Sequence, residues 1–214
     1  MGNGETERES AADVSQTKSS GAHPGLGPIP PRYNRLMRPP VLILPGLFNS
    51  GPGHWQTIWE SQHPDYRRVQ QLDWTTPRCA DWIAALDAAL SAAGGPFVLA
   101  AHSLACATVA HWARSYSSNG RVQAAFLVAP TDVEAPTFPT GSTGFQPMPI
   151  ERLPFRSVVV SSVDDPYVTL HRAEAFASAW GSQFIHLGRA GHINSESGHG
   201  PWPEGEQWLE NLRG

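Results

Sequence analysis

The sequence predicts an α/β fold in which a mostly parallel sheet is covered by helices on both faces. Short apolar runs rich in β-branched residues recur along the chain, and segments of helical period lie between them. Such alternation of strands and helices is typical of parallel sheets, whose strands are buried on both faces. The length of 214 residues fits a single domain with a sizeable core.

Each expected strand is a short apolar run bounded by turn residues. The six runs lie at residues 41–44, 67–72, 97–101, 124–129, 157–162 and 183–187. Helical patterns between them cover residues 54–62, 104–117, 170–180 and 203–212.

The clearest helix follows Thr76, which is the expected N-cap. Pro77 suits the first helical position, and Gly94 and Gly95 would end the helix. Its apolar side chains fall on one face: Trp82, Ile83, Leu86, Ala89 and Leu90.

The N-terminal segment differs in composition from the rest. The first 40 residues contain six prolines, five glycines and four serines, with few large apolar side chains. Such a segment cannot bury enough surface to offset its ordering entropy. We therefore expect residues 1–37 to be a disordered tail and residues 38–214 to form the folded domain.

Charge and cysteine content exclude several classes of protein. The net charge of −4 gives no reason to expect nucleic acid or an anionic membrane as a partner. Cys79 and Cys106 are too few for a disulfide framework and lie in no metal-binding spacing, so free thiols and no metal or organic cofactor are expected. No secretion signal or run of roughly 20 apolar residues is present, so we expect a cytoplasmic protein.

Ser103 lies at the carboxyl end of a predicted strand, where parallel sheets carry their functional residues. Ligands bind at the carboxyl ends of such strands, and Ser103 follows the run 97–101 and directly precedes a helix. This is the geometry of a nucleophile elbow, whose strained backbone requires small residues two positions before and after the serine. Ala101 and Ala105 meet that requirement. Taken alone, the stretch also fits a serine that caps a helix.

Two later strand ends supply the partners that a serine nucleophile needs. Asp164 and Asp165 follow one strand, and His192 lies in a glycine-rich loop after the next. A serine nucleophile needs a base, and the base needs a carboxylate to orient it. The chain order Ser, Asp, His is that of α/β-hydrolases. We therefore predict a catalytic triad of Ser103, Asp165 and His192.

The acid position has alternatives. Asp165 is preferred because it is the turn carboxylate immediately before Pro166. Asp164 is the main alternative. Asp132, after the run 124–129, is a lesser one, because some hydrolases place the acid one strand earlier.

The base position has alternatives as well. His199 is second to His192 and is expected to be a loop surface residue. His102 is expected to point away from the site, and His111 to be a partly buried helical residue.

Backbone amides are the expected oxyanion donors. The amide after the nucleophile is that of Leu104, and the second donor normally lies just after the first strand. There Leu47 follows Gly46, which permits a close backbone approach. Phe48 is the alternative second donor.

The interval before the predicted acid strand is too short for a lid domain. Residues 130–156 include six prolines, which exclude long helices and leave room for at most a short one at 149–153. We expect this segment to rim the site as a loop, with Phe138, Phe145 and Met148 lining a shallow acyl pocket together with Phe48.

Several segments together resemble the small serine hydrolases of the retinoblastoma-binding-protein-9 type. They are "ILPGLFNSGPGHWQ", "AHSLACATVAHWA", "LVAPTDVE", "SSVDDPY" and "GHINSESGHGPWPEG", within residues 40–214. The resemblance implies a three-layer α/β-hydrolase fold with Ser103, Asp165 and His192 as its triad.

The expected function is cleavage of small esters, thioesters or amides through an acyl-enzyme, as in carboxylesterases, with a small-molecule acyl substrate. The alternative is a binding module that keeps the fold but has little turnover.

Overall fold

The computed structural model describes Met1 and residues 38–92, 95–116 and 119–214. The predicted tail therefore lies outside the described residues, Met1 excepted. The strands are β1 (Val41–Leu44), β2 (Tyr66–Arg68), β3 (Phe97–His102), β4 (Val122–Val128), β5 (Arg156–Ser161) and β6 (Gln183–His186). The helices are α1 (Trp55–Gln62), α2 (Cys79–Ser91), α3 (Leu104–Ser115), α4 (Leu170–Trp180) and α5 (Pro203–Arg213).

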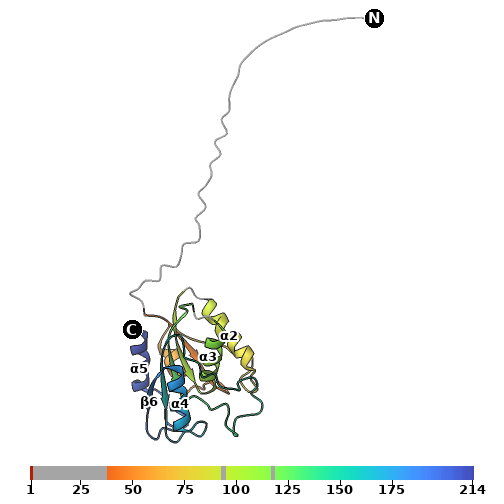
Figure 1. Cartoon of the computed structure of the whole chain (residues 1–214). Coiled ribbons are helices and arrows are strands. Elements are labelled where there is room, and N and C mark those ends of the chain that lie inside the picture. Colours follow the sequence, from red (N-terminus) through yellow and green to blue (C-terminus); the bar gives the residue numbers. More distant parts are fainter. Residues whose placement is uncertain (2–37, 93–94, 117–118) are drawn as a thin grey trace. The chain divides into compact units, whose positions relative to one another are not determined.

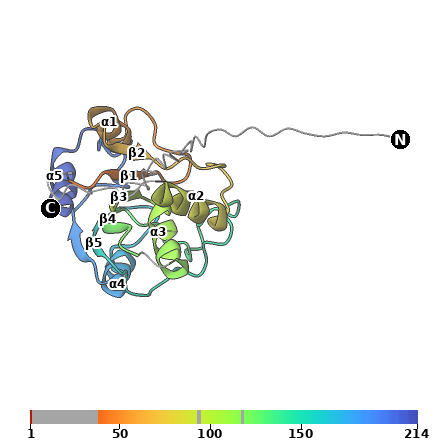
Figure 2. The same ribbon diagram turned by 90° about the horizontal axis from the view of Figure 1, so that it is seen from above.

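The six strands form one parallel sheet in the order β2-β1-β3-β4-β5-β6. Helices cover both of its faces (Figures 1 and 2). This three-layer arrangement confirms the predicted fold class. Because all strands point the same way, the loops after them gather at one edge, where the site lies.

Alternate strand residues pack on opposite faces of the sheet. In β1, Leu42 and Leu44 belong to a core cluster with α2, α3 and α4, whereas Val41 and Ile43 belong to one with α1 and α5. Each large cluster is anchored by buried tryptophans, such as Trp82 in the first. The near-continuous apolar strands follow from this burial on both faces.

Several predicted boundaries differ from the structure, and two of the differences have a clear physical reason. Helix α2 begins at Cys79 rather than near Pro77, because Thr76 does not cap it: the Thr76 hydroxyl donates to Asp73 Oδ2 at 2.6 Å. Strand β2 ends at Arg68 instead of continuing to residue 72. Its single neighbour in the sheet, β1, ends at Leu44, one residue after their last pair, so further pairing has no partner strand.

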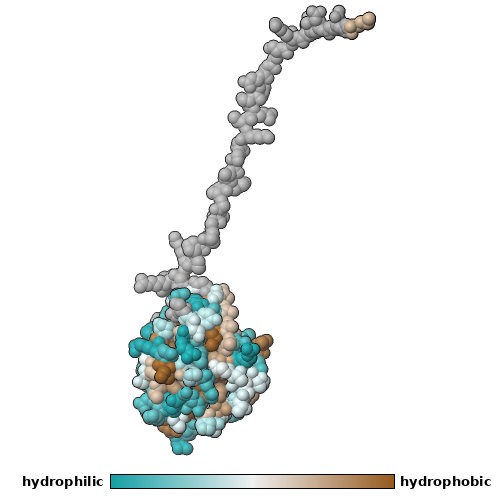
Figure 3. All heavy atoms as spheres, turned by 45° about the vertical axis from the view of Figure 1, so that its right-hand side comes forward, coloured by the Kyte–Doolittle hydropathy of each residue, from teal (hydrophilic) through white to brown (hydrophobic). Residues whose placement is uncertain are grey.

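Residues 129–155, between β4 and β5, form turns without any helix or strand. No lid domain is built there. On the face shown in Figure 3, apolar residues are scattered among hydrophilic ones. None of the helices in the described ranges has the length and apolarity needed to cross a membrane.

Both cysteines are free thiols buried on the same side of the sheet. Burial raises the pKa of Cys79 to about 12 and raises that of Cys106 as well. Neither thiol is therefore activated as a nucleophile.

Candidate active site

Ser103 sits in a sharp turn between β3 and α3. Its φ of 57° and ψ of −124° lie in a region that side-chain-bearing residues rarely adopt. The turn is held because the Ser103 amide donates to Val128 O at 2.9 Å. Ala101 and Ala105 are both buried beside it, in agreement with the size requirement of an elbow.

Gly46 explains how the loop after β1 reaches the serine. A Cβ at this position would lie 2.7 Å from Ser103 Cβ and 3.0 Å from His102 O. Real Cβ atoms do not approach so closely, so this contact needs glycine.

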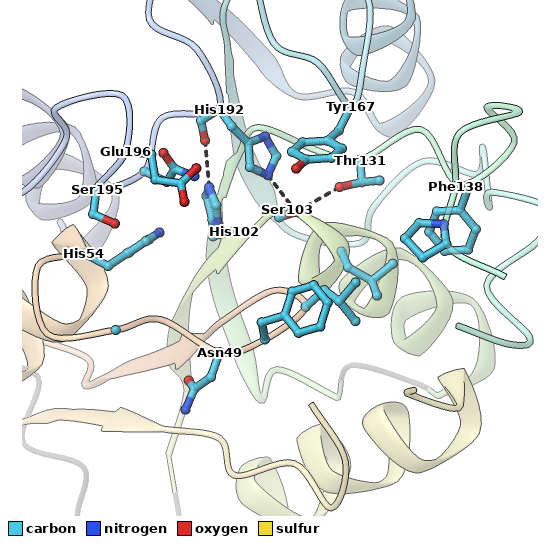
Figure 4. A pocket seen from close by; sticks show the side chains of 16 residues that line it. Asn49, His54, His102, Ser103, Thr131, Phe138, Tyr167, His192, Ser195 and Glu196 are labelled. Carbon is cyan, nitrogen blue, oxygen red and sulfur yellow. Dashed lines mark hydrogen bonds between the residues drawn. The ribbon is translucent and has the colours of Figure 1, made fainter. Parts of the chain in front are cut away.

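Three side chains from three strand ends form one hydrogen-bonded chain. His192 Nε2 lies 2.8 Å from Ser103 Oγ (Figure 4). On the other side of the ring, His192 Nδ1 lies 2.9 and 3.0 Å from the two carboxylate oxygens of Asp165. The Asp165 side chain is 0% exposed and that of His192 is 9% exposed. Tyr167 N donates to Asp165 Oδ1 at 2.9 Å, which fixes the carboxylate further.

Asp164 faces the backbone of the histidine loop instead of the imidazole. Its Oδ1 accepts from Gly191 N at 2.9 Å and from Ala190 N at 3.0 Å. These hydrogen bonds, with that from Gly191 contributing most, lower the pKa of Asp164. Asp132 is also turned away from the imidazole, because it forms a bidentate pair with Arg172 at 2.9 Å.

The other histidines have separate partners. His199 Nδ1 contacts Ser197 Oγ at 3.2 Å within its own loop. His111 is buried, and its Nε2 donates to Phe145 O at 2.9 Å. His102 Nε2 donates to the backbone oxygen of His192 at 2.9 Å, so it holds the histidine loop without reaching the serine oxygen.

His54 extends a row of imidazoles through His102 to His192. The ring centroids are 4.7 and 4.8 Å apart along the row. Burial, with the nearby positive charge of a protonated His192, lowers the pKa of His54 to about 3. Burial also lowers the pKa of His102 well below its usual value. Both rings are thus neutral near pH 7.

The two amides proposed as oxyanion donors line the pocket. Phe48 N donates to Trp74 O at 2.7 Å, so that amide is already engaged. Within the described ranges, the amides of Leu47 and Leu104 donate to no protein acceptor. Both are available to a negatively charged oxygen beside Ser103.

A cavity of about 320 Å³ opens beside Ser103. Its apolar wall comprises Leu47, Phe48, Leu104, Phe138, Pro139 and Tyr167. Its polar wall includes Asn49, Asn194, Ser195 and Glu196. In the residues that the structure describes, no group of His, Cys, Asp or Glu side chains is arranged to hold a metal ion.

Two of the predicted pocket residues lie elsewhere. Phe145 and Met148 are buried in the core, where Phe145 packs edge-on against Trp82 with centroids 5.9 Å apart. A large apolar side chain gains more from complete burial than from lining a partly open pocket. Of the four predicted lining residues, Phe48 and Phe138 contact the cavity.

Sequence reasoning missed Thr131 and His54. Thr131 lies three residues after Val128, the last residue of β4, and its hydroxyl is 2.9 Å from Ser103 Oγ. Its position after a strand is the available signal, although a hydroxyl there is less distinctive than the neighbouring Asp132 carboxylate. His54 lies in the loop after β1, and nothing in its sequence context indicates its burial.

Comparison with known proteins agrees with this architecture. The chain is similar in structure to a YdeN-like hydrolase from Pectobacterium atrosepticum, with 28% identity over 82% of this chain and 91% of that one and a TM-score of 0.73. It is also similar to the ydeN gene product from Bacillus subtilis, at 18% identity over 81% of this chain and 98% of that one, with a TM-score of 0.64. No curated protein sequence matches.

The model of one protein family, described as serine hydrolase, matches residues 41–211. Because this match spans most of the chain and the fold is that of the α/β-hydrolase superfamily, the chain belongs to the serine hydrolase family and its function is hydrolytic.

Proposed function

We propose that the protein cleaves small carboxylic esters, thioesters or amides through an acyl-enzyme on Ser103, with His192 and Asp165 completing a catalytic triad. The observation that carries this proposal is the unbroken line of hydrogen bonds from Asp165 through His192 to Ser103 Oγ. A binding module would have no need of such a line beside a cavity.

Acylation begins with attack of Ser103 Oγ on the acyl carbon. His192 Nε2 takes the serine proton and then gives it to the leaving group. Asp165 keeps the imidazole in the tautomer that can accept this proton. The amides of Leu47 and Leu104 stabilise the oxyanion. Water then attacks the acyl-enzyme by the same proton route, which releases the acid and restores the serine.

A fluorophosphonate probe tests the nucleophile, because labelling requires an activated serine. We expect wild-type protein to be labelled and Ser103→Ala to lose both labelling and, by roughly 10⁴–10⁶-fold, ester turnover. Ser195→Ala is the matched control, since Ser195 is an exposed serine in the same pocket. Labelling that persists in Ser103→Ala would exclude this serine, and an unlabelled wild type would favour the binding module.

The cavity supports a preference for short acyl chains. It measures about 320 Å³, and no lid element from residues 129–155 extends it. Each extra CH₂ contributes about 0.8 kcal/mol only where it can be buried. We expect kcat/KM for p-nitrophenyl esters to peak between acetate and butyrate and to fall by octanoate, without a jump at the solubility limit. A steady rise through decanoate in detergent-free buffer would contradict this.

We also propose that the chain belongs with the retinoblastoma-binding-protein-9 type within its family, and that it acts in the cytoplasm. The first proposal is supported by the five sequence segments that resemble that type. The second is supported by two cysteines that remain free thiols.

A further inference from the structure

The serine oxygen has a second side-chain neighbour besides His192. Thr131 Oγ1 lies 2.9 Å from Ser103 Oγ, and Figure 4 shows the two contacts leaving the serine in different directions. Thr131 is 7% exposed and lines the cavity. It therefore meets the nucleophile at the place where substrate would bind.

Proton accounting identifies Thr131 as the donor in this contact. The Asp165 carboxylate can only accept, so the hydrogen on His192 is at Nδ1 and Nε2 is a bare acceptor. Ser103 must then donate its one proton to Nε2. The remaining contact to Ser103 Oγ can be made only if the Thr131 hydroxyl donates.

The backbone around Thr131 is built to hold it there. Ala129, two residues earlier, has a φ of 50°, which costs free energy for a residue with a Cβ. Asp132, one residue later, is clamped by Arg172, and its amide donates to Tyr167 O at 3.0 Å. No other partner of the Thr131 hydroxyl is found in the described part of the chain.

We propose that Thr131 is a fourth catalytic residue, whose hydroxyl donates a hydrogen bond to Ser103 Oγ and stabilises charge on that oxygen when the acyl-enzyme breaks down. The proposal rests on the acyl-enzyme at Ser103 proposed above.

In deacylation, water attacks the acyl carbon while His192 Nε2 takes its proton. The bond from the acyl carbon to Ser103 Oγ then breaks, its electron pair goes to Oγ, and His192 returns a proton there. The Thr131 hydrogen bond strengthens as that oxygen gains charge. The ester oxygen of the acyl-enzyme is a poorer acceptor than a free hydroxyl, so the gain is larger in deacylation than in acylation.

The test separates the two steps by rapid mixing with the best p-nitrophenyl ester. The initial burst reports acylation, and the steady rate that follows reports deacylation. For Thr131→Val we expect deacylation to slow roughly 10- to 100-fold, the range for losing one hydrogen bond to a charged group, and acylation to slow less. kcat and KM should fall together.

Two further variants isolate the hydroxyl from the methyl group. Thr131→Ser keeps the hydroxyl and should stay within about threefold of wild type, whereas Thr131→Ala should deacylate as slowly as Thr131→Val. Thr131→Ser and Thr131→Ala both lack the threonine methyl group and differ only in the hydroxyl. Their comparison therefore tests the hydroxyl even if Thr131→Val fails to fold. Thr108→Val, which removes a buried hydroxyl within α3, is the control and should leave both rates unchanged.

The proposal is overturned if Thr131→Ala deacylates as fast as Thr131→Ser. It is also overturned if Thr131→Ala and Thr131→Val slow acylation as much as deacylation. These outcomes are distinct from failure of the proposed function. In that case wild-type protein would show no fluorophosphonate labelling at Ser103 and no burst.

Discussion

The two edges of the sheet differ in how much strain their backbones carry. Six non-glycine residues in the loops after the strands have positive φ values: Phe48, Asn49, Ser103, Ala129, Ile193 and Trp202. Among the described residues of the loops that lead into strands, Asn119 alone does so. Left-handed conformations are unfavourable for residues with a Cβ. The difference shows that conformational strain is concentrated at the edge with the candidate site. The two apolar clusters on the faces of the sheet supply the stability that offsets this strain.

The largest expected effect is a loss of kcat on substituting Asp165 at the strained edge, compared with substituting its neighbour Asp164. Asp165→Asn should lower kcat by roughly 10⁴, the loss described for the equivalent change in trypsin, because an amide holds the imidazole in the wrong tautomer. Asp164→Asn should cost far less, since Asp164 contacts backbone amides. Steady-state kinetics on both variants decides between them. A reversed order would move the acid by one residue.

Gly46→Ala should lower kcat by roughly 10²–10³-fold, which is the effect of losing one oxyanion donor. The reason is that the added Cβ would displace either Ser103 or the Leu47 amide. Gly51→Ala is the matched control in the same loop, where a Cβ meets nothing within 4 Å. Equal activity in both variants would show that the loop after β1 can move without cost.

The buried imidazole of His54 predicts a pH-dependent stability. Its folded pKa of about 3 lies below the unfolded value of 6.5, so the unfolded chain binds the extra proton between these values. Stability is therefore complete above pH 6.5 and is lost as pH falls, by up to about 1.4 kcal/mol per pH unit. His54→Asn keeps an N-cap acceptor for α1. Urea unfolding at pH 6.5, 5.5 and 4.5 should show a shallower slope in the variant, and an unchanged slope would contradict the argument.

At the opposite edge, a glycine should affect stability and leave catalysis unchanged. Gly181 ends α4 before β6 with a φ of 70°. Gly181→Ala should lower the free energy of unfolding by about 1–2 kcal/mol. Its kcat/KM should remain that of wild type. A loss of kcat/KM would show that the two edges are coupled.

The smallest expected effect is a difference in stability between two inactive variants. Ser103→Gly should be more stable than Ser103→Ala by about 1 kcal/mol, because glycine adopts φ of 57° and ψ of −124° without strain. Denaturant unfolding measures the difference. If Ser103→Ala is the more stable variant, the elbow is not strained.

The sequence predicted the order of the strands and helices well because burial on both faces makes each strand a distinct apolar run. The rule that chemistry follows strand ends also indicated where Ser103, Asp165 and His192 come together. It could not show that the hydroxyl of Thr131 faces the serine, because that depends on the left-handed turn at Ala129, for which alanine gives no signal. Nor could it show that Phe145 is buried in the core, since apolar residues in a proline-rich loop fit either a core or a pocket.

The buried thiols of Cys79 and Cys106 have a practical consequence for spectroscopy. They are the two cysteines of the chain, and both are shielded from reagents in the folded protein. A single cysteine placed at the exposed Leu72 would therefore be the one thiol open to a maleimide dye. The loop that carries Leu72 is joined to the loop after β1 through the Phe48–Trp74 hydrogen bond, and Leu72 itself does not line the cavity. A dye at this position would therefore mark the neighbourhood of the candidate site while leaving the cavity open.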